Sequence, residues 1–324
     1  MYHRPTVYVS LQVTSACEYN CIHCIVNSKH FPSSDELSID EIKAIIHELS
    51  MAKDISPVII FTGGDPMLRK DLRQMINFSV NENVRYYVMP SASPMVSGEF
   101  MSFLSENNAS GIVISLDGIN PKIHDAIRRS LGLLDLTVYL LREAKKHGLR
   151  TIVSTTVMKQ NITNLPDIAV FLHDLGITDW VLLFLVNKGR ASSLEMVNEV
   201  EKKAVLRWSR SLLSSGIKTE VIGTIDHDYL TDQADEELEL KSSSLFDFLV
   251  KKTSRIIYLE DIKKTAIKES MSNEWFQMYV SCNGKVYDSI FSGNMIGDVR
   301  RDKFKNLISR TMANESKSML KDIE

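Results

Sequence analysis

Three of the four cysteines lie within eight residues, in the segment Cys17-Glu-Tyr-Asn-Cys21-Ile-His-Cys24. A disulfide framework would spread its cysteines in pairs along a secreted chain, so this clustering predicts a metal site instead. Three thiolates at this spacing can bind three corners of a [4Fe–4S] cubane and leave one iron open to a small molecule. The alternative is a structural zinc ion with His23 or His30 as fourth ligand, although such sites usually pair two ligand knuckles.

The cysteine segment directly follows a predicted β-strand, so the surrounding elements decide where the thiols lie. Short apolar runs rich in β-branched residues alternate with amphipathic stretches over about two thirds of the chain, and these runs predict strands. The six predicted strands span residues 6–14, 58–61, 85–89, 111–115, 150–157 and 180–186. The thiols therefore follow the carboxyl end of the first strand, which is the active-site edge in α/β folds.

Helical patterns lie between these strands. The clearest one begins at Ser38, which can cap the helix while Glu41 completes a capping box. Strands that are apolar on both faces and alternate with helices imply right-handed βαβ units and a parallel sheet. The predicted fold class is α/β, a partial (β/α)6 barrel of the TIM type, because six units are too few to close eight strands. The other predicted helices span 72–81, 97–107, 133–146 and 165–175, with Gly148 and Gly176 as C′ residues of the last two.

The pattern changes after the first two thirds of the chain. Residues 226–244 are polar and mostly acidic, which predicts a solvated loop. The run of residues 278–289 predicts a hairpin with Asn283-Gly284 as its turn. We therefore expect two domains, residues 1–222 and a smaller α+β domain of residues 223–324.

Composition excludes several classes of protein. Of the 324 residues, 44% are hydrophobic and 24% charged, so disordered, collagen-like and coiled-coil chains are excluded. The 38 basic and 41 acidic residues give a net charge of −3, which makes a nucleic-acid partner unexpected. No apolar stretch approaches the roughly 20 residues that span a bilayer, so we expect no membrane partner and a cytoplasmic location.

Several motifs together carry a resemblance to a known family. The Cys-x3-Cys-x2-Cys motif after the first strand and Thr62-Gly-Gly-Asp-Pro66 after the second resemble the radical S-adenosylmethionine (radical SAM) superfamily. Ser115-Leu-Asp-Gly118 and His124-Asp-Ala-Ile-Arg128 agree with this, and the resemblance covers residues 7–190. Residues 282–288 and 294–300 are similar to the start of a SPASM accessory domain. Only Cys282 remains there, so this domain is degenerate or truncated and cannot hold a cysteine-ligated auxiliary cluster.

The resemblance implies two cofactors. A [4Fe–4S] cluster would be ligated by Cys17, Cys21 and Cys24, and the amine and carboxylate of S-adenosylmethionine would chelate its open iron. One electron, from a donor such as flavodoxin or ferredoxin, would cleave the cofactor to methionine and a 5′-deoxyadenosyl radical that abstracts a substrate hydrogen. The protein would supply orientation and exclude water.

The resemblance also assigns residues at the strand ends to S-adenosylmethionine. Gly63, Gly64 and Asp65 would approach the methionyl amine, since glycines let backbone carbonyls come close. Arg128 would meet the carboxylate with its fork of donors. The remaining expected contacts are Asp117 and Ser115 to the ribose or methionyl end and His23 to the adenine, with Ser91, Ser93, Thr155 and Thr156 as weaker candidates on the same rim.

The substrate is less sharply defined by the sequence. The SPASM-like segment makes a ribosomally made peptide the first candidate, and a tetrapyrrole, another cofactor precursor or another small molecule the second. A non-catalytic member that binds a partner is a third hypothesis. Cys282 has two interpretations, an inert buried thiol or a hydrogen-atom donor to the substrate radical.

Overall fold

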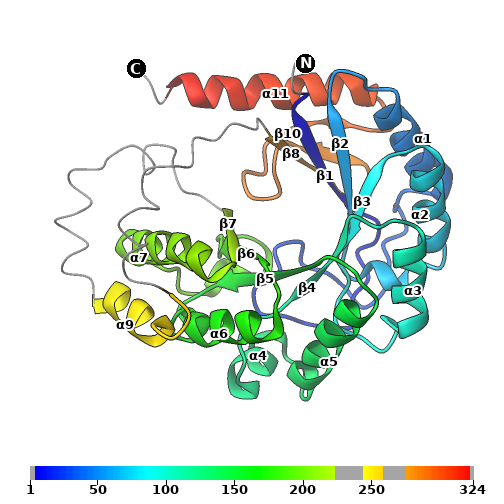
Figure 1. The fold of residues 1–324 in the computed structure, drawn as a ribbon. Helices are drawn as coiled ribbons and strands as arrows, with labels where there is room; N and C mark the ends of the chain where they lie inside the picture. Colours follow the sequence, from blue (N-terminus) through cyan, green and yellow to red (C-terminus); the bar gives the residue numbers. More distant parts are fainter. Residues whose placement is uncertain (1–3, 223–243, 258–274, 322–324) are drawn as a thin grey trace.

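One ten-stranded sheet organises the residues that the computed structural model describes, which are 4–222, 244–257 and 275–321 (Figure 1). Its strand order is β10-β9-β8-β1-β2-β3-β4-β5-β6-β7. Neighbours from β8 through β1 to β7 pair in parallel, while β8–β9 and β9–β10 pair antiparallel. The strands are β1 (Thr6–Gln12), β2 (Ser56–Thr62), β3 (Arg85–Val88), β4 (Gly111–Ser115), β5 (Thr151–Val157), β6 (Asp179–Phe184), β7 (Lys218–Ile222), β8 (Trp275–Val280), β9 (Lys285–Tyr287) and β10 (Met295–Asp298).

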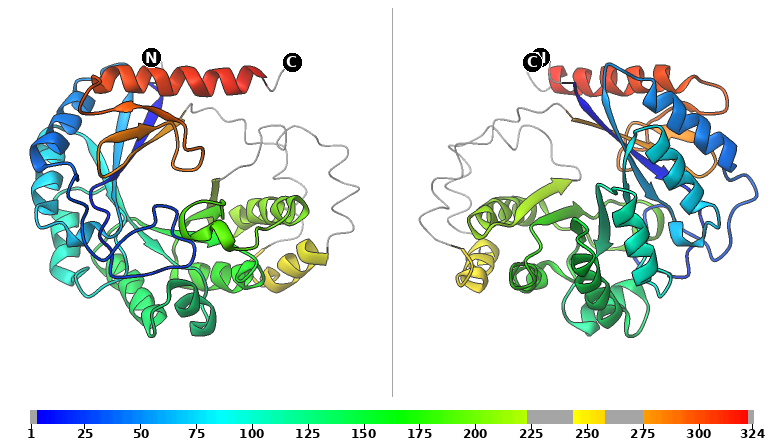
Figure 2. Two further views of the ribbon diagram at one scale, coloured as in Figure 1. Left: turned by 180° about the vertical axis from the view of Figure 1, so that it is seen from behind. Right: turned by 45° about the vertical axis from the view of Figure 1, so that its right-hand side comes forward.

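Helices cover the outer face of the curved sheet (Figures 1 and 2). Between them and the sheet lies an apolar core that includes the edge-to-face pair of Trp180 and Trp208, with ring centroids 6.0 Å apart. The helices are α1 (Ile39–Ser50), α2 (Leu72–Asn81), α3 (Gly98–Glu106), α4 (Pro121–Arg128), α5 (Leu133–Lys146), α6 (Leu165–Leu175), α7 (Glu199–Ser211), α9 (Ser244–Thr253) and α11 (Phe304–Lys321).

Local signals place the helix ends as the sequence predicted. The Ser38 side chain accepts from the Glu41 backbone N–H, and the Glu41 side chain accepts from the Ser38 N–H, so the capping box is confirmed. Gly176 ends α6 with a φ of 66°, a left-handed conformation that suits glycine. The six predicted strands are all present, with ends shifted by at most two residues.

Two further parallel strands, β7 and β8, extend the predicted (β/α)6 unit. The order β8-β1-β2 through β7 is that of an eight-stranded barrel, but β7 and β8 do not pair within the described residues. The α/β class and the partial barrel of TIM type are therefore confirmed, with C-terminal antiparallel strands and a helix added to the sheet.

The C-terminal strands join the sheet beside β1. The predicted hairpin turn is confirmed, because Gly284 between β8 and β9 has a φ of 87°. Past β9, the Phe291 carbonyl accepts a hydrogen bond from the Lys188 ammonium in the loop after β6. The predicted domain boundary coincides with the end of β7 at Ile222 and stays a prediction, while most of the acidic stretch, residues 226–243, lies outside the described residues.

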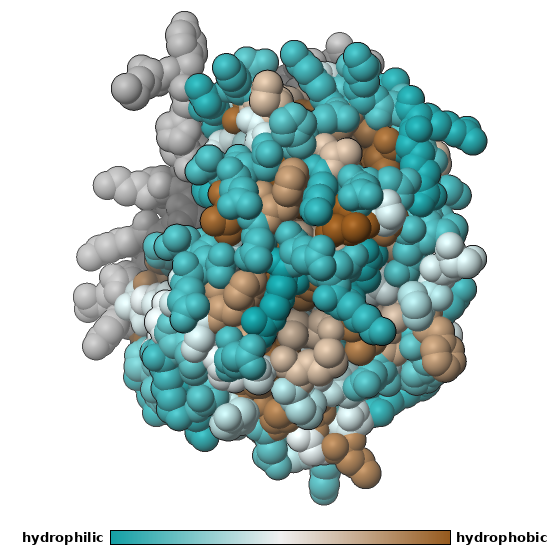
Figure 3. All heavy atoms as spheres, turned by 90° about the vertical axis from the view of Figure 1, so that its right-hand side faces the viewer, coloured by the Kyte–Doolittle hydropathy of each residue, from teal (hydrophilic) through white to brown (hydrophobic). Residues whose placement is uncertain are grey.

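The outer surface over α1, α2 and α3 is mainly hydrophilic, with apolar patches scattered across it (Figure 3). These helices bury one face only, as in α1, where the buried residues Ile42, Ile45, Ile46 and Leu49 recur at helical spacing. None of the described helices is long and apolar enough to cross a membrane.

Candidate functional site

The three clustered cysteines lie on a loop that leaves the carboxyl end of β1 and folds back on itself. The Cys17 N–H donates to the Lys29 carbonyl at 2.7 Å, and the Lys29 N–H donates to the Ser15 carbonyl at 2.9 Å. These two bonds close residues 15–29 into one compact loop. The structure thus places Cys17, Cys21 and Cys24 together at the edge of the sheet where the sequence predicted them.

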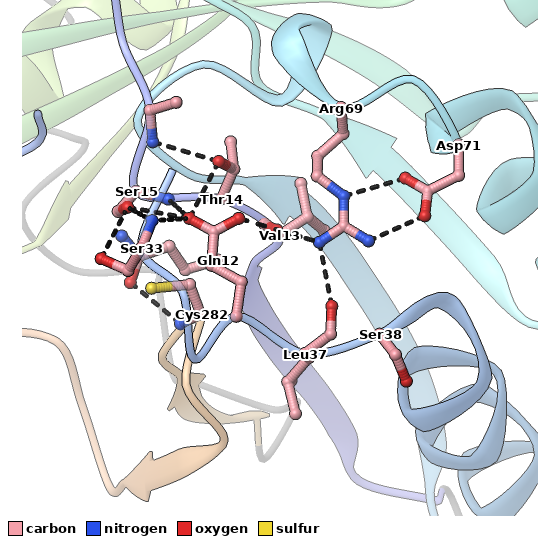
Figure 4. A network of polar contacts seen from close by, with 12 residues as sticks. Gln12, Val13, Thr14, Ser15, Ser33, Leu37, Ser38, Arg69, Asp71 and Cys282 are labelled. Atoms are coloured by element: carbon pink, nitrogen blue, oxygen red, sulfur yellow. Dashed lines mark hydrogen bonds and ion pairs between the residues drawn. The ribbon is translucent and has the colours of Figure 1, made fainter. Parts of the chain in front are cut away.

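The Glu36 carboxylate, on a side chain only 9% exposed, fixes the base of this loop. Thr14, Ser15 and Ser33 meet at this point (Figure 4). Glu36 Oε1 accepts from the Ser15 N–H at 2.7 Å and the Ser15 hydroxyl at 2.8 Å, and from the Thr14 hydroxyl and the Ser33 N–H, both at 3.1 Å. Beside it, Arg69 forms an ion pair with Asp71 at 2.8 Å. The same guanidinium donates to the carbonyls of Val13 and Leu37 at 2.7 and 3.0 Å. Charged groups therefore anchor the chain just before the first cysteine.

Hydrogen-bond donors surround two of the three sulfur atoms. The Tyr19 N–H donates to Cys17 Sγ at 3.4 Å, and the Ser91 hydroxyl lies 3.7 Å from the same sulfur. The Ser28 N–H donates to Cys24 Sγ at 3.4 Å, and the Ser28 hydroxyl is equally close. Donors of this kind stabilise a thiolate, which is the form that binds metal.

The three thiols differ in exposure: Cys17 is buried, whereas Cys21 and Cys24 are partly exposed. Burial raises the pKa of both Cys17 and Cys21. Among the described residues, no three His, Cys, Asp or Glu side chains converge as ligands of a single ion. A cubane does not require such convergence, because each of its cysteines binds a different iron.

The end of β2 packs directly against the cysteine loop. The Gly64 N–H donates to the Thr14 carbonyl and the Asp65 N–H to the Ala16 carbonyl, both at 2.7 Å. A Cβ on Gly63 would lie 2.7 Å from the Thr14 oxygen, and one on Gly64 would lie 2.1 Å from the Ala16 oxygen. Only glycine fits at either position, so both glycines have a packing role beside the cofactor contact expected from the sequence.

Asp65 is a buried carboxylate whose contacts in the described part of the chain are hydrogen bonds rather than ion pairs. Its Oδ1 accepts from the Met67 N–H at 3.1 Å and the Ser91 N–H at 3.2 Å. Among the described residues no ion pair to this carboxylate is formed, and burial raises the pKa of Asp65 to about 6. A ligand ammonium beside it would supply the missing positive charge.

Asp117 is buried as well, but its charge is matched. Arg128 Nε and Nη2 each lie 2.8 Å from Asp117 Oδ2, and the Thr156 N–H donates to Oδ1 at 3.0 Å. Burial alone would raise the pKa of Asp117, but Arg128 and the nearby His23 outweigh it, so the pKa is lowered. His124 Nδ1 accepts from the Asp117 N–H at 3.1 Å. Asp117 and Arg128 thus form a buried ion pair, in which Oδ2 of the carboxylate binds Nε and Nη2 of the guanidinium.

Two buried polar side-chain atoms lack a hydrogen-bond partner in the described part of the chain: His23 Nδ1 and Ser93 Oγ. Burial lowers the pKa of His23 to about 4, so the ring is neutral at pH 7. Unpaired buried polar atoms are costly unless a ligand or water satisfies them. Together with Asp65 and the three thiols, they fit a site for an iron–sulfur cluster and a polar, cationic ligand.

Other sequence candidates lie elsewhere or are already engaged. The Thr155 hydroxyl donates to the Leu116 carbonyl at 2.6 Å and accepts from Trp180 Nε1 at 2.8 Å, so it belongs to the core behind the sheet. Ser115 is the last residue of β4 and Thr156 the penultimate residue of β5, so both lie at the predicted carboxyl edge of the sheet. The structure thus brings Gly63, Gly64, Asp65 and Ser91 against the cysteine loop, with the Asp117–Arg128 pair beside His23 and Cys21, and leaves Thr155 out.

Cys282 lies next to the base of the loop, on the β8 side (Figure 4). Its N–H donates to Gln12 Oε1 at 3.1 Å, and its carbonyl accepts from the Leu37 N–H at 2.6 Å. Burial, with Glu36 and Asp35 nearby, raises the pKa of this thiol to about 11. The backbone of Cys282 therefore helps to tie β8 to the loop.

Sequence reasoning missed Glu36, Arg69 and Arg190. Glu36 and Arg69 bind the chain on either side of the cysteine loop, and Arg190 Nε donates to the Cys21 carbonyl within it. Glu36 lies in a polar Ser- and Asp-rich stretch that gives no hint of burial. Arg190 follows Gly189 shortly after the sixth predicted strand, at the same edge as the thiols. Its place just after a predicted strand was the sequence signal that could have identified Arg190 as a residue near the thiols.

The comparison with known families agrees with this geometry. The family model described as the radical SAM superfamily matches residues 11–172, and the chain belongs to this superfamily. The predicted class, radical SAM enzyme, is thereby confirmed. S-adenosylmethionine and an iron–sulfur cluster are the general cofactors of the family.

Relatives show what the chain is similar to. An AdoMet-dependent heme synthase of Oleidesulfovibrio alaskensis is 30% identical over 62% of this chain and 51% of its own length. An Fe-coproporphyrin III synthase of Methanosarcina barkeri is 30% identical over 73% of this chain and 61% of its own length. The chain therefore spans between half and two thirds of these relatives.

A solved structure shares the fold. Streptococcus suis SuiB bound to S-adenosylmethionine superimposes with a TM-score of 0.63 over 92% of this chain and 64% of the SuiB chain, at 10% identity. At this identity the likeness concerns the fold alone. The resemblance inferred from the sequence motifs is thus confirmed at the level of superfamily and fold.

Proposed function

We propose that Cys17, Cys21 and Cys24 hold a [4Fe–4S] cluster and that S-adenosylmethionine binds between it and the ends of β2 and β3. When bound, these cofactors supply a 5′-deoxyadenosyl radical for abstraction of a substrate hydrogen. The observation that carries this proposal is the juxtaposition of three thiols on one compact loop with the buried Asp65 carboxylate, which has no ion-pair partner among the described residues. An ammonium group placed there would lower the desolvation cost of Asp65.

The proposed contacts follow from the open positions of the site. Asp65, on the turn formed by Gly63 and Gly64, binds the methionyl ammonium. Ser93 Oγ and His23 Nδ1, both buried without partners among the described residues, supply further polar contacts. Because His23 is neutral at pH 7, its ring can accept a hydrogen bond without adding charge beside the ligand.

On the opposite flank we propose a positioning role for the Asp117–Arg128 pair. Burial lowers the pKa of Arg128, but Asp117 and then Cys21 outweigh it, so the guanidinium stays charged near the sulfur. The ion pair fixes its orientation, and the remaining N–H groups can meet a carboxylate. Ser115, Ser91 and Thr156 complete the proposed rim.

For the substrate we propose a tetrapyrrole rather than the peptide that the sequence placed first. Support comes from the two relatives at 30% identity, named heme synthase and Fe-coproporphyrin III synthase. A peptide stays the second candidate because SuiB has been solved with its precursor peptide SuiA, although at 11% identity. We propose that the C-terminal segment lies over the mouth of the barrel. Its Phe291 carbonyl binds Lys188, in the same loop as Arg190, whose N–H donates to the Cys24 carbonyl. A flavodoxin or ferredoxin is the proposed electron donor.

The test begins with anaerobic purification and assay of iron and sulfide, with Cys21→Ala as the matched variant. We expect four irons per chain in the wild type and loss of the cluster in the variant. Dithionite and S-adenosylmethionine should then release 5′-deoxyadenosine, with Fe-coproporphyrin III or co-expressed peptides as substrates followed by mass spectrometry. A single zinc ion, or no iron and sulfide, would refute the proposed cofactor; a mass change in peptides alone would refute the tetrapyrrole.

A further inference from the structure

The loop after β6 holds the cysteine loop by its backbone. Arg190 Nε donates to the Cys21 carbonyl at 2.8 Å, and Nη1 donates to the Ser28 carbonyl at 2.8 Å. The Arg190 N–H donates to the Cys24 carbonyl at 3.0 Å. One residue from a distant strand end therefore fixes three points of the segment that carries the second and third cysteines.

The preceding glycine makes this approach possible. Gly189 has a φ of 59°, and a Cβ built on it would lie 2.3 Å from the Cys24 carbonyl oxygen and 2.6 Å from that of Ile25. Both the conformation and the space therefore exclude a side chain. The backbone of the β6 loop is in direct contact with the third cysteine.

Ser28 connects the guanidinium to a sulfur atom. Arg190 Nη2 lies 3.3 Å from the Ser28 hydroxyl, and that hydroxyl and the Ser28 N–H each lie 3.4 Å from Cys24 Sγ. With its carbonyl held by Nη1 as well, Ser28 has little freedom to turn away. The two donors on Cys24 thus depend on Arg190.

We propose that Arg190 is a positioning residue that, through Ser28, orients Cys24 and raises the reduction potential of the cluster. Hydrogen bonds to cluster sulfur and a nearby positive charge both favour the reduced, more negative form, so their effects have the same sign. This inference rests on the proposed cluster, and nothing in it depends on the substrate.

The test compares variants by iron and sulfide content and by the midpoint potential from an EPR-monitored titration. Arg190→Gln removes both the positive charge and the guanidinium donors, whereas Arg190→Lys keeps the charge. Ser28→Ala keeps the backbone N–H that donates to Cys24 Sγ but removes the hydroxyl. Arg150→Gln is the matched control, because Arg150 lies at the amino end of β5 and pairs with Asp179 at 2.6 Å. We expect a shift to more negative potential, largest in Arg190→Gln, with Arg150→Gln unchanged.

Each outcome decides the matter. An unchanged potential and iron content in Arg190→Gln would overturn the inference, and so would an equal loss of iron in Arg150→Gln, which would indicate general destabilisation. If Arg190→Gln fails to load iron while Arg190→Lys loads it, the positioning role is supported, and Ser28→Ala then tests the potential. A wild type without iron and sulfide would instead refute the proposed function itself.

Discussion

The two flanks of the candidate site differ in whether their buried polar groups are paired. On the β4–β5 flank, Asp117 is paired with Arg128, and the Thr155 hydroxyl is bonded on both sides. On the β2–β3 flank, Asp65 has no ion-pair partner and Ser93 Oγ has no hydrogen-bond partner among the described residues. On the first flank the carboxylate and the hydroxyl are both paired within the described residues, whereas on the second flank the corresponding groups are open to a ligand.

This difference indicates where ligand affinity originates. A satisfied buried pair stabilises the protein and gains little from a ligand, while an unsatisfied group costs stability until a ligand arrives. Substitutions on the two flanks should therefore separate stability from affinity. The expected effects below run from the largest to the smallest.

The largest effect is expected for Asp117→Asn. It leaves the Arg128 guanidinium buried without its carboxylate, which should cost about 3–5 kcal/mol of unfolding free energy. Urea unfolding of the metal-free protein measures this. The double variant Asp117→Asn/Arg128→Met should recover part of the loss, because it no longer buries a lone charge. A loss below about 1 kcal/mol would show that the pair is not what completes this flank.

Asp65→Asn should raise the unfolding free energy, whereas Asp117→Asn lowers it. Because the folded pKa of about 6 lies above the ordinary aspartate value of 3.8, the carboxylate destabilises the folded state increasingly as the pH rises through this window. The variant keeps both acceptor contacts and should be more stable than the wild type by about 3 kcal/mol at pH 8, with no difference below pH 4.

The same variant should bind S-adenosylmethionine more weakly, as measured by calorimetry on the cluster-loaded protein, because the ammonium loses its carboxylate. Urea unfolding at pH 4 and pH 8 provides the stability comparison. An equal stability difference at both pH values would contradict the assignment of a buried, unpaired carboxylate.

The smallest effects should come from two hydroxyl groups. Thr155→Val leaves Trp180 Nε1 without its acceptor and should cost about 1–2 kcal/mol, with unchanged affinity for S-adenosylmethionine. Ser93→Ala removes a hydroxyl that has no partner among the described residues, so stability should change by less than about 1 kcal/mol while affinity falls several-fold. The same two assays apply. If Thr155→Val lowered affinity more than Ser93→Ala, the contrast between the flanks would be wrong.

Much of the fold could be predicted because its signals are local. The bounds of α2, α5 and α6 agree with the predicted ranges, and periodicity, caps and glycines lie within each segment. β7 was missed because Lys218 and Glu220 interrupt its apolar pattern. The parallel pairing of β8 with β1 was missed for another reason, since the Tyr279 hydroxyl bonds to Gln12 across 267 residues and leaves no local trace.

The residues of the candidate site likewise fall into those that the sequence reveals and those that only the folded structure reveals. Cysteine spacing and the Gly63-Gly64 pair are motifs in the sequence, and the structure brings them together. Glu36 accepts from two backbone N–H groups as well as two hydroxyls, and Arg190 donates to two backbone carbonyls; backbone partners leave no mark on the sequence. Their roles become visible only when the strand ends are assembled.

The addition of β8 next to β1 has a consequence for biogenesis. While the chain emerges from the ribosome, β2 can cover one edge of β1 early, but the other edge stays uncovered until residues 275–280 have been synthesised. The hydrogen bond from the Leu37 N–H to the Cys282 carbonyl likewise cannot form until residue 282 has been synthesised. The cysteine-bearing segment therefore reaches its final support late, and nascent chains halted before Trp275 should be prone to aggregate through this edge.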